Sequence, residues 1–307
     1  MSLISKIISV FNRDNKTIVI CGPTASGKSE LAVQMGLLFD GEVLSADSRQ
    51  VYRGLDIGSG KISIEEMSGV PHHMLDIADP VETYNAARFQ EDGYKVLEEI
   101  WARDKLAIIC GGSGLYIDAI LRRVSFPNIS PDQNFRKSLV KQSTEELFQK
   151  LESQDPRRAQ NVDKNNRVRI VRALEILNKM NHVPEQKIAE IPAMWIGLDF
   201  PDAELRNRIY QRLLHRLDEQ DMVREVRDLI MAGLPYERLS ELGLEYKYIA
   251  QYVQKLISRD ELIEKLFSEI WQFARRQRTW FRKNERIEWF HPMLGQSEIA
   301  DKIKKWI

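Results

Sequence analysis

A stretch near the start of the chain has the residue types and the spacing of a phosphate-binding loop. The pattern G-x-x-x-x-G-K-[ST] is matched at every fixed position by Gly22-Pro23-Thr24-Ala25-Ser26-Gly27-Lys28-Ser29. In such a loop the backbone N–H groups and the start of the next helix converge on an anionic group. The Lys28 ammonium adds positive charge, and the Ser29 hydroxyl can bind Mg²⁺. The sequence therefore predicts that the chain binds a diphosphate or a triphosphate, without saying which.

A second group of polar residues follows the next apolar run. It reads Ser45-Ala46-Asp47-Ser48-Arg49-Gln50-Val51-Tyr52 and brings a carboxylate, a guanidinium and an amide together. Asp47 could bind Mg²⁺ or accept a proton, and Gln50 could form paired hydrogen bonds with the edge of a base. The alternative interpretation is a turn in which Asp47 caps the following helix. Because this segment should lie beside the phosphate loop, we favour a functional role.

Apolar runs that end just before these polar segments predict the strands that position them. The runs cover 17–21, 42–46 and 105–110, and helical patterns separate them. This alternation predicts a parallel sheet with crossover helices. Sites in such sheets lie at the carboxyl ends of the strands, so the residues that follow the three runs should meet around one cleft.

The second half of the chain is expected to be mostly helical. From about residue 125 to 189 the strand signal disappears, and the pattern becomes polar, basic and helical. A strand is expected at 194–198, then a long helix from Asp202 that stops near Gly233, then two further helices. We predict an α/β fold, with a P-loop NTPase-like parallel sheet and an all-helical insertion domain. Its parts are the core at 1–124, the helical insertion at 125–189, and the rest of the core with the C-terminal helices at 190–307.

Composition and charge exclude several classes of protein. Among 307 residues, 29% are charged and the net charge is zero, which is typical of a folded globular chain. Basic residues nevertheless concentrate between Arg157 and Lys187 and again over 275–286, as a polyanionic partner contacted over part of the surface would require. Solvated helix faces are the alternative explanation. Two cysteines give no disulfide framework, and no apolar run could span a membrane, so we expect a cytoplasmic protein.

Further motifs extend along nearly the whole chain in a fixed order. They are 22–29, 45–58, Val70-Pro71-His72-His73-Met74-Leu75-Asp76-Ile77, Gly111-Gly112-Ser113-Gly114-Leu115-Tyr116, Arg169-Ile170-Val171-Arg172-Ala173-Leu174-Glu175, and Arg275-Arg276-Gln277-Arg278-Thr279-Trp280-Phe281-Arg282. In these segments the chain resembles the tRNA dimethylallyltransferase family in its bacterial form. A series of this length is far more specific than a phosphate loop alone.

The resemblance implies a reaction and roles for residues near the phosphate loop. The family transfers a dimethylallyl group from its diphosphate to N6 of the adenosine at position 37, beside the tRNA anticodon. Asp47 would be the base that takes the proton from the weakly nucleophilic adenine amine. The loop N–H groups, Lys28 and Mg²⁺ on Ser29 would stabilise the leaving diphosphate, and the Thr24 hydroxyl could contact it. Arg208 and Arg212 match spaced arginines of the family and would clamp the diphosphate, unless they form an exposed basic face.

The resemblance also implies how tRNA would be held. The reacting adenosine must leave its stack, while the helical insertion and the basic C-terminal helix grip the anticodon stem-loop through its phosphates. The residues that would contact tRNA are Asp47, Ser48, Arg49, Gln50, Ser113, Arg167, Arg169, Arg172, Arg276, Gln277 and Arg282.

Three short segments depart from the family pattern. Ser113 replaces a threonine and keeps the hydroxyl, and Ser59-Gly60-Lys61 replaces Thr-Ala-Lys. Glu245-Tyr246-Lys247-Tyr248 stands where Gly-Tyr-Lys/Arg-Glu is common. The last change adds a side chain at a glycine position and could alter a turn or a tRNA contact.

Other functions fit part of the sequence. A P-loop kinase of a nucleoside or small molecule would explain the loop and Asp47, but not the basic insertion or the 275–282 segment. A prenyltransferase acting on free adenylate would not need those basic regions, and a non-catalytic RNA-binding module would tolerate Asp47→Asn. We therefore expect a monomeric prenyltransferase that acts on tRNA, uses Mg²⁺ and contacts no membrane. The loop could also accept ATP, which the reaction does not need.

Overall fold

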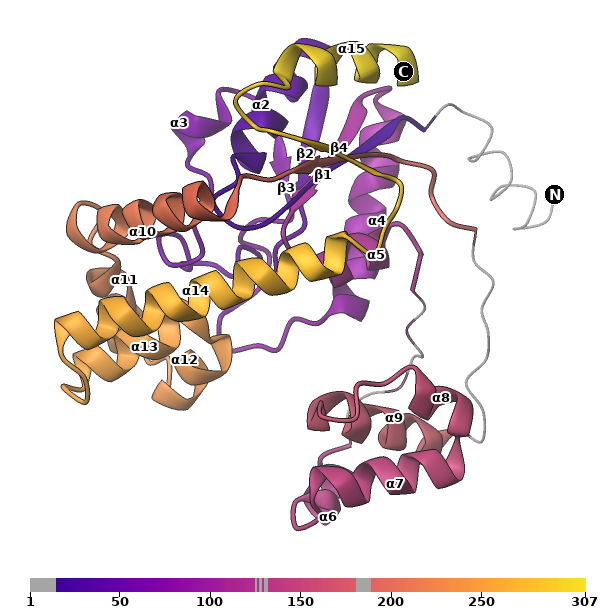
Figure 1. The fold of residues 1–307 in the computed structure, drawn as a ribbon, viewed down its shortest axis with the longest axis vertical. Coiled ribbons are helices and arrows are strands. Elements are labelled where there is room, and N and C mark those ends of the chain that lie inside the picture. The colour runs from indigo at the N-terminus through magenta and orange to yellow at the C-terminus, as the bar shows by residue number, and fades with distance from the viewer. Residues whose placement is uncertain (1–14, 125, 127–128, 130–131, 181–188) are drawn as a thin grey trace. The chain divides into compact units, whose positions relative to one another are not determined.

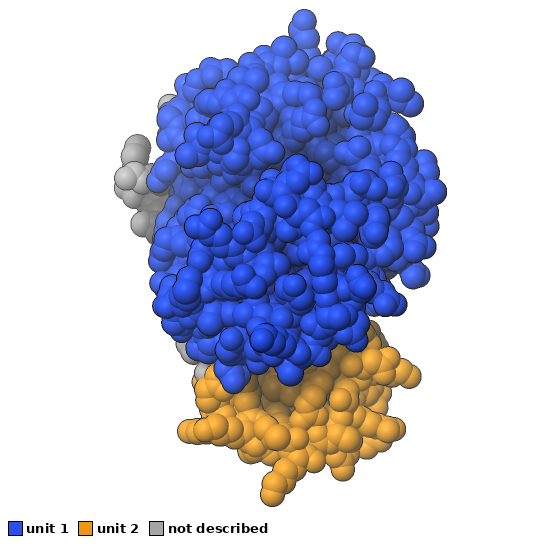
Figure 2. All heavy atoms as spheres, turned by 90° about the vertical axis from the view of Figure 1, so that its left-hand side faces the viewer, with its two compact units in different colours: residues 1–123, 190–307 blue, residues 124–189 orange. Residues whose placement is uncertain are grey.

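A computed structural model describes residues 15–124, 126, 129, 132–180 and 189–307. The chain divides into two compact units (Figure 2). The first joins residues 1–123 to 190–307, and the second is formed by residues 124–189. Part of the predicted insertion, at 125, 127–128, 130–131 and 181–188, lies outside the described residues.

A six-stranded parallel sheet forms the centre of the first unit (Figure 1). Its order is β3-β2-β4-β1-β5-β6. The strands are β1 Thr17–Cys21, β2 Gly41–Ser45, β3 His72–His73, β4 Leu106–Gly111, β5 Met194–Leu198 and β6 Ile287–Phe290. Every residue of β1, β2 and β4 is buried, as expected for parallel strands covered on both faces. The predicted α/β fold with a parallel sheet is confirmed.

Helices pack on both faces of the sheet. Side chains of α2 (Lys28–Phe39) and α15 (Gln296–Trp306) share one apolar cluster with β1, β2, β4 and β5. The crossover helix α4 (Ala86–Ala102) contacts β2 and β4 and packs on α5 (Gly114–Ile120), and Figure 1 shows α2 and α4 on opposite sides of the strands. The short α3 (Ile64–Met67) begins with a capping box from Ser63 and Glu66.

The C-terminal half of the first unit adds a layer of helices next to the sheet. These are α10 Asp202–Asp218, α11 Met222–Met231, α12 Tyr236–Leu242, α13 Leu244–Val253 and α14 Arg259–Phe281. Helix α14 runs along α10 and α13 (Figure 1). The prediction of one helix from Asp202 to Gly233 is wrong, because Asp221 adopts φ 55° and its side chain caps a new helix, α11. Two helices were expected after Gly233, whereas the described chain has four there, α12 to α15.

Four helices make up the described part of the second unit. They are α6 Gln133–Leu139, α7 Thr144–Gln154, α8 Pro156–Gln160 and α9 Arg167–Lys179, and their core is built mainly on leucine. Glu175 lies fully buried beside this core. Burial would raise its pKa, but hydrogen bonds from Arg136, the Asp132 backbone and Arg172 lower the pKa to about 2. The unit therefore holds an ionised carboxylate in its interior.

Within the residues described, no helix is both long enough and apolar enough to cross a bilayer.

Candidate active site

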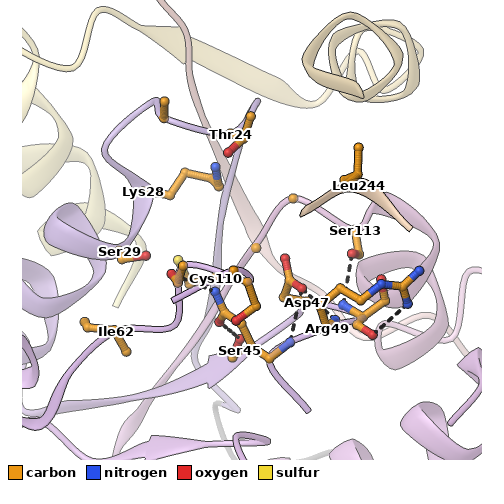
Figure 3. A pocket seen from close by; sticks show the side chains of 18 of the residues that line it. Thr24, Lys28, Ser29, Ser45, Asp47, Arg49, Ile62, Cys110, Ser113 and Leu244 are labelled. Atoms are coloured by element: carbon orange, nitrogen blue, oxygen red, sulfur yellow. Dashed lines mark hydrogen bonds between the residues drawn. The ribbon is translucent and has the colours of Figure 1, made fainter. Parts of the chain in front are cut away.

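The carboxyl ends of three neighbouring strands form the floor of one cavity. In the sheet, β4 lies between β1 and β2, so the loops that follow these strands are adjacent. The cavity has a volume of about 160 Å³, and its wall includes Thr24, Lys28, Ser29, Asp47 and Ser113 (Figure 3). The prediction that the three loops meet around one cleft is confirmed.

The lysine of the phosphate loop binds the backbone of its own loop. Gly27 adopts φ 83°, a conformation that favours glycine, and lets helix α2 start at Lys28. The Lys28 ammonium donates a hydrogen bond to the Pro23 carbonyl at 2.6 Å. Burial lowers the pKa of Lys28 to about 8, and the nearby charge of Arg212 acts in the same direction. An anionic ligand in the cavity would oppose both effects.

Asp47 has one carboxylate oxygen engaged and one available. Oδ1 accepts the backbone N–H groups of Arg49 at 2.8 Å and of Gln50 at 3.4 Å, which fixes the turn after β2. For Oδ2, the described part of the chain provides no hydrogen-bond donor. The side chain thus fixes its own turn, but it caps no helix, since the next helix in the chain is α3 at Ile64–Met67. Asp47 also lines the cavity (Figure 3).

The polar residues around Asp47 hold the loops in place. Gln50 accepts a hydrogen bond from the Ser45 hydroxyl at 2.9 Å and donates one to the Gly60 carbonyl at 3.2 Å. The Ser113 hydroxyl accepts the Ser48 N–H at 3.3 Å, and the Arg49 guanidinium donates to the Leu242 carbonyl at 2.6 Å. These bonds use both ends of the Gln50 amide inside the protein.

Gln277 of α14 bridges two of the loops. Its amide oxygen accepts the Thr24 N–H at 2.8 Å, and its nitrogen donates to the Gly112 carbonyl at 3.0 Å. The residue is 6% exposed. Sequence reasoning assigned Gln277 to tRNA, but both ends of the amide are bound to the core here. Its partners lie 253 and 165 positions away in the chain, so no local pattern could reveal this bridge.

Three arginines at four-residue spacing lie along α10. Arg208 donates to the Ala25 carbonyl at 3.0 Å, and Arg212 and Arg216 line the cavity. The charge of Arg216, together with burial, lowers the pKa of Arg212 to about 9. The sequence analysis missed Arg216, although its position one turn beyond Arg212 is the signal that could have found it.

Residues 58–60 line the cavity, and the backbone just before them is held by a carboxylate that sequence reasoning also missed. Glu225 of α11 accepts the backbone N–H groups of Asp56, Ile57 and Gly58 at 2.9, 2.5 and 3.0 Å. It also accepts the Tyr246 hydroxyl at 3.1 Å. The carbonyls of this segment therefore have fixed positions.

The predicted tRNA-contacting arginines differ in their surroundings. In the second unit, Arg167 donates to the Gln142 and Leu139 carbonyls at 2.5 and 2.8 Å, and Arg172 binds the buried Glu175. Arg169 in the same helix is exposed.

On and just after α14, Arg276 is exposed and the Arg282 side chain is 68% exposed. Arg276 and Trp280 line a shallow hollow of about 350 Å³ together with Arg275 and Lys283. The Trp280 indole N–H donates to Asp118 at 3.1 Å, which fixes its edge.

The residues at the phosphate loop fit a magnesium ion of the kind that nucleotide and diphosphate sites use. Ser29 and Asp47 line the same cavity and offer a hydroxyl and a carboxylate oxygen. In the described ranges, no group of three or more histidine, cysteine or acidic side chains is arranged to hold a metal ion. Mg²⁺ commonly takes one or two protein ligands and completes its shell with phosphate oxygens and water, so this donor set suits it.

Comparison with known proteins identifies the family. Residues 50–284 match the family model described as IPP transferase. The chain is 39% identical over 290 residues to tRNA dimethylallyltransferase 1 of Geotalea uraniireducens, which covers 92% of this chain and 96% of that protein. It is 41% identical to tRNA dimethylallyltransferase 2 of Shewanella sediminis, over 92% and 94% of the two chains.

A solved structure agrees with these relatives. The full-length tRNA isopentenylpyrophosphate transferase of Bacillus halodurans superposes with a TM-score of 0.71 and 32% identity, over 95% of this chain and 98% of that one. The phosphate loop, the Asp47 turn and the α10 arginines thus belong to a chain that matches these enzymes over nearly its full length. The chain is a member of the tRNA dimethylallyltransferase (IPP transferase) family.

Proposed function

We propose that this enzyme transfers the dimethylallyl group of dimethylallyl diphosphate to N6 of adenosine 37 in tRNA, releasing diphosphate. The observation that carries the proposal is the cavity itself. Asp47 and Lys28 line this one cavity in a chain of the tRNA dimethylallyltransferase family, which supports a carboxylate base acting beside an anion-binding loop. Family membership excludes the alternative function of a P-loop kinase. That alternative also did not explain the basic insertion or the 275–282 segment.

Asp47 would act on the nucleophile. The lone pair of the adenine N6 amine is delocalised into the ring, so attack on the allylic carbon needs a base that removes the proton as the bond forms. Asp47 lines the cavity, no described donor binds its Oδ2, and the bonds from Arg49 and Gln50 to Oδ1 fix the carboxylate. Its rigid turn supports this role because a positioned base needs no reorganisation during the reaction.

The leaving diphosphate would lie on the phosphate loop. Its charge grows as the C1–O bond breaks, and the loop N–H groups, Lys28, Arg208 and Arg212 would stabilise it. Thr24 would contact the same group through its hydroxyl. A magnesium ion on Ser29, when bound, would supply further positive charge.

Basic surfaces of both units would bind the anticodon stem-loop through its phosphates. We propose Arg169, Arg276 and Arg282 as direct contacts, since their side chains are exposed. Arg167 and Arg172 would support the second unit, and Gln50 and Gln277 would support the loops of the site, in accord with their internal bonds. We further propose a cytoplasmic monomer for which ATP is not a substrate.

The proposal is tested by following a radioactive dimethylallyl group from its diphosphate to unmodified tRNA in the presence of Mg²⁺. We expect label in tRNA with adenosine at position 37 and none in a matched tRNA with guanosine there. Label in both tRNAs, or ATP consumption on a nucleoside without transfer to tRNA, would overturn it.

A further inference from the structure

Two guanidinium groups and one carboxylate share a wall of the cavity. Arg212 and Arg216 come from α10, and Glu245 comes from the first turn of α13. Arg216 is 8% exposed and Glu245 is 9% exposed. The Arg216 Nη1 atom lies 3.4 Å from Glu245 Oε1 and donates to the Gly58 carbonyl at the same distance. Arg216 is therefore already paired inside the protein.

The segment 58–60 fixes the ends of both arginines. Arg212 Nη2 lies 3.5 Å from the Gly60 carbonyl oxygen, and Glu225 anchors the N–H groups just before it. Gly60 has φ 64°, and a Cβ atom built there would overlap guanidinium nitrogens of both Arg212 and Arg216. The two guanidinium groups consequently occupy space that the side chain of any other residue at position 60 would fill.

The charges of this cluster are unbalanced without Glu245. Arg212 and Arg216 repel each other in a largely dehydrated wall, an effect that also lowers the pKa of Arg212. Asp47 lines the same cavity, and Glu245 provides the direct partner of Arg216. A buried arginine paired with a carboxylate is less available to a second anion than an unpaired one.

Gly60 and Glu245 are also two of the positions at which the sequence departs from the family pattern. An alanine at position 60 would displace the arginine ends, and a glycine at position 245 would leave Arg216 without its carboxylate. Both positions therefore lie against the same guanidinium group, that of Arg216.

We propose that Glu245 is a resident counter-ion that holds Arg216 away from a bound diphosphate and so lowers the affinity of the site for that anion. Lys28, Arg208 and Arg212 then remain as the cations that bind it. This inference rests on the proposed diphosphate site and adds a residue that sets its strength. Its consequence is faster release of the diphosphate product, since a guanidinium fork on a phosphate is among the stronger charged contacts.

Calorimetric titration of the full chain with inorganic diphosphate tests the proposal, at about pH 8 because burial raises the pKa of Glu245. We expect Glu245→Gln to bind diphosphate about tenfold more tightly than the unaltered chain. The matched control is Glu219→Gln, which removes a 72% exposed carboxylate at the end of α10 and should leave the affinity within about twofold. Unchanged or weaker binding by a folded Glu245→Gln variant would overturn the proposal.

A second pair of variants tests the route through Arg216. Arg216→Gln should change the affinity of the unaltered chain by less than about threefold, because Glu245 already occupies that guanidinium. Arg216→Gln placed on Glu245→Gln should abolish the gain. Persistence of the gain in the double variant, or a large loss of affinity in Arg216→Gln alone, would contradict the counter-ion role.

The prenyl-transfer assay separates this inference from the proposed function. If the unaltered chain transfers the dimethylallyl group but Glu245→Gln binds diphosphate no more tightly, only the counter-ion inference fails. If the unaltered chain neither binds diphosphate nor modifies tRNA, the proposed function fails and the inference fails with it.

Discussion

At the scale of residues, the site is built from groups whose partners are distant in the sequence. Asp47, Lys28 and the phosphate loop were predicted because a local motif contains them. Glu225 and Gln277 were not assigned their roles, because each binds backbone groups more than 160 positions away in the chain. Arg216 was missed although it repeats the spacing of Arg208 and Arg212. A local motif identifies a candidate residue, but only the folded structure shows which atoms its side chain contacts.

The Lys28 ammonium gives the site a pH dependence. Burial lowers the pKa of Lys28 from the usual 10.5 to about 8. The group is therefore cationic below about pH 8 and loses its charge above it. We expect kcat/KM for dimethylallyl diphosphate to be flat below about pH 8 and to fall as the pH rises through that value. Lys28→Arg should move this fall to higher pH whatever its effect on the plateau. The same fall in both proteins would assign it to another group.

At the scale of elements, long apolar runs were predictable and short or broken elements were not. Strands β1, β2, β4 and β5 coincide with runs that the sequence shows directly. Strand β3 has two residues and β6 has four, with two of its residues exposed, so neither gives a clear pattern. The break between α10 and α11 depends on one residue in a left-handed conformation, which composition does not signal.

Helix α14 is expected to stabilise the phosphate loop through Gln277. Gln277→Leu would leave the Thr24 N–H and the Gly112 carbonyl without their partner, at a cost of about 1–3 kcal/mol in the free energy of unfolding. KM for dimethylallyl diphosphate should rise as well. Denaturant unfolding and steady-state kinetics would measure both. Gln272→Leu, at an exposed position of the same helix, is the control and should change neither quantity.

Glu175 is expected to hold the second unit together. Glu175→Gln removes the negative charge that Arg136, Arg172 and the Asp132 N–H bind. We expect the free energy of unfolding of the second unit to fall by about 3 kcal/mol. This is the lower end of the range for buried ion pairs, because both arginines are partly exposed. Since the pKa of Glu175 is lowered to about 2 from 4.5, this stabilisation is present above about pH 4.5 and is lost as the pH falls toward 2. Hydrogen exchange of α9 amides across this pH range would detect it. Equal protection in the two proteins would contradict the role.

At the scale of the whole molecule, binding of tRNA should be mainly electrostatic although the net charge of the chain is zero. We expect the combined change Arg276→Gln and Arg282→Gln to weaken tRNA binding and to reduce the slope of log Kd against log salt by about 0.7–0.9 per lost phosphate contact. Binding of inorganic diphosphate should be unaffected. Lys95→Gln on α4, a 61% exposed cation, is the control. An unchanged slope would exclude both arginines from the interface.

The proposed reaction depends on Asp47 as the group that removes the proton from the adenine amine. The most direct measurement is the single-turnover rate of dimethylallyl transfer by Asp47→Asn with saturating tRNA and dimethylallyl diphosphate, alongside the dissociation constants of both ligands. The amide can still accept the Arg49 and Gln50 N–H groups, so the turn should persist. We predict a rate lower by about 10²–10⁴-fold with nearly unchanged dissociation constants. A rate within about threefold of the unaltered enzyme would contradict the claim.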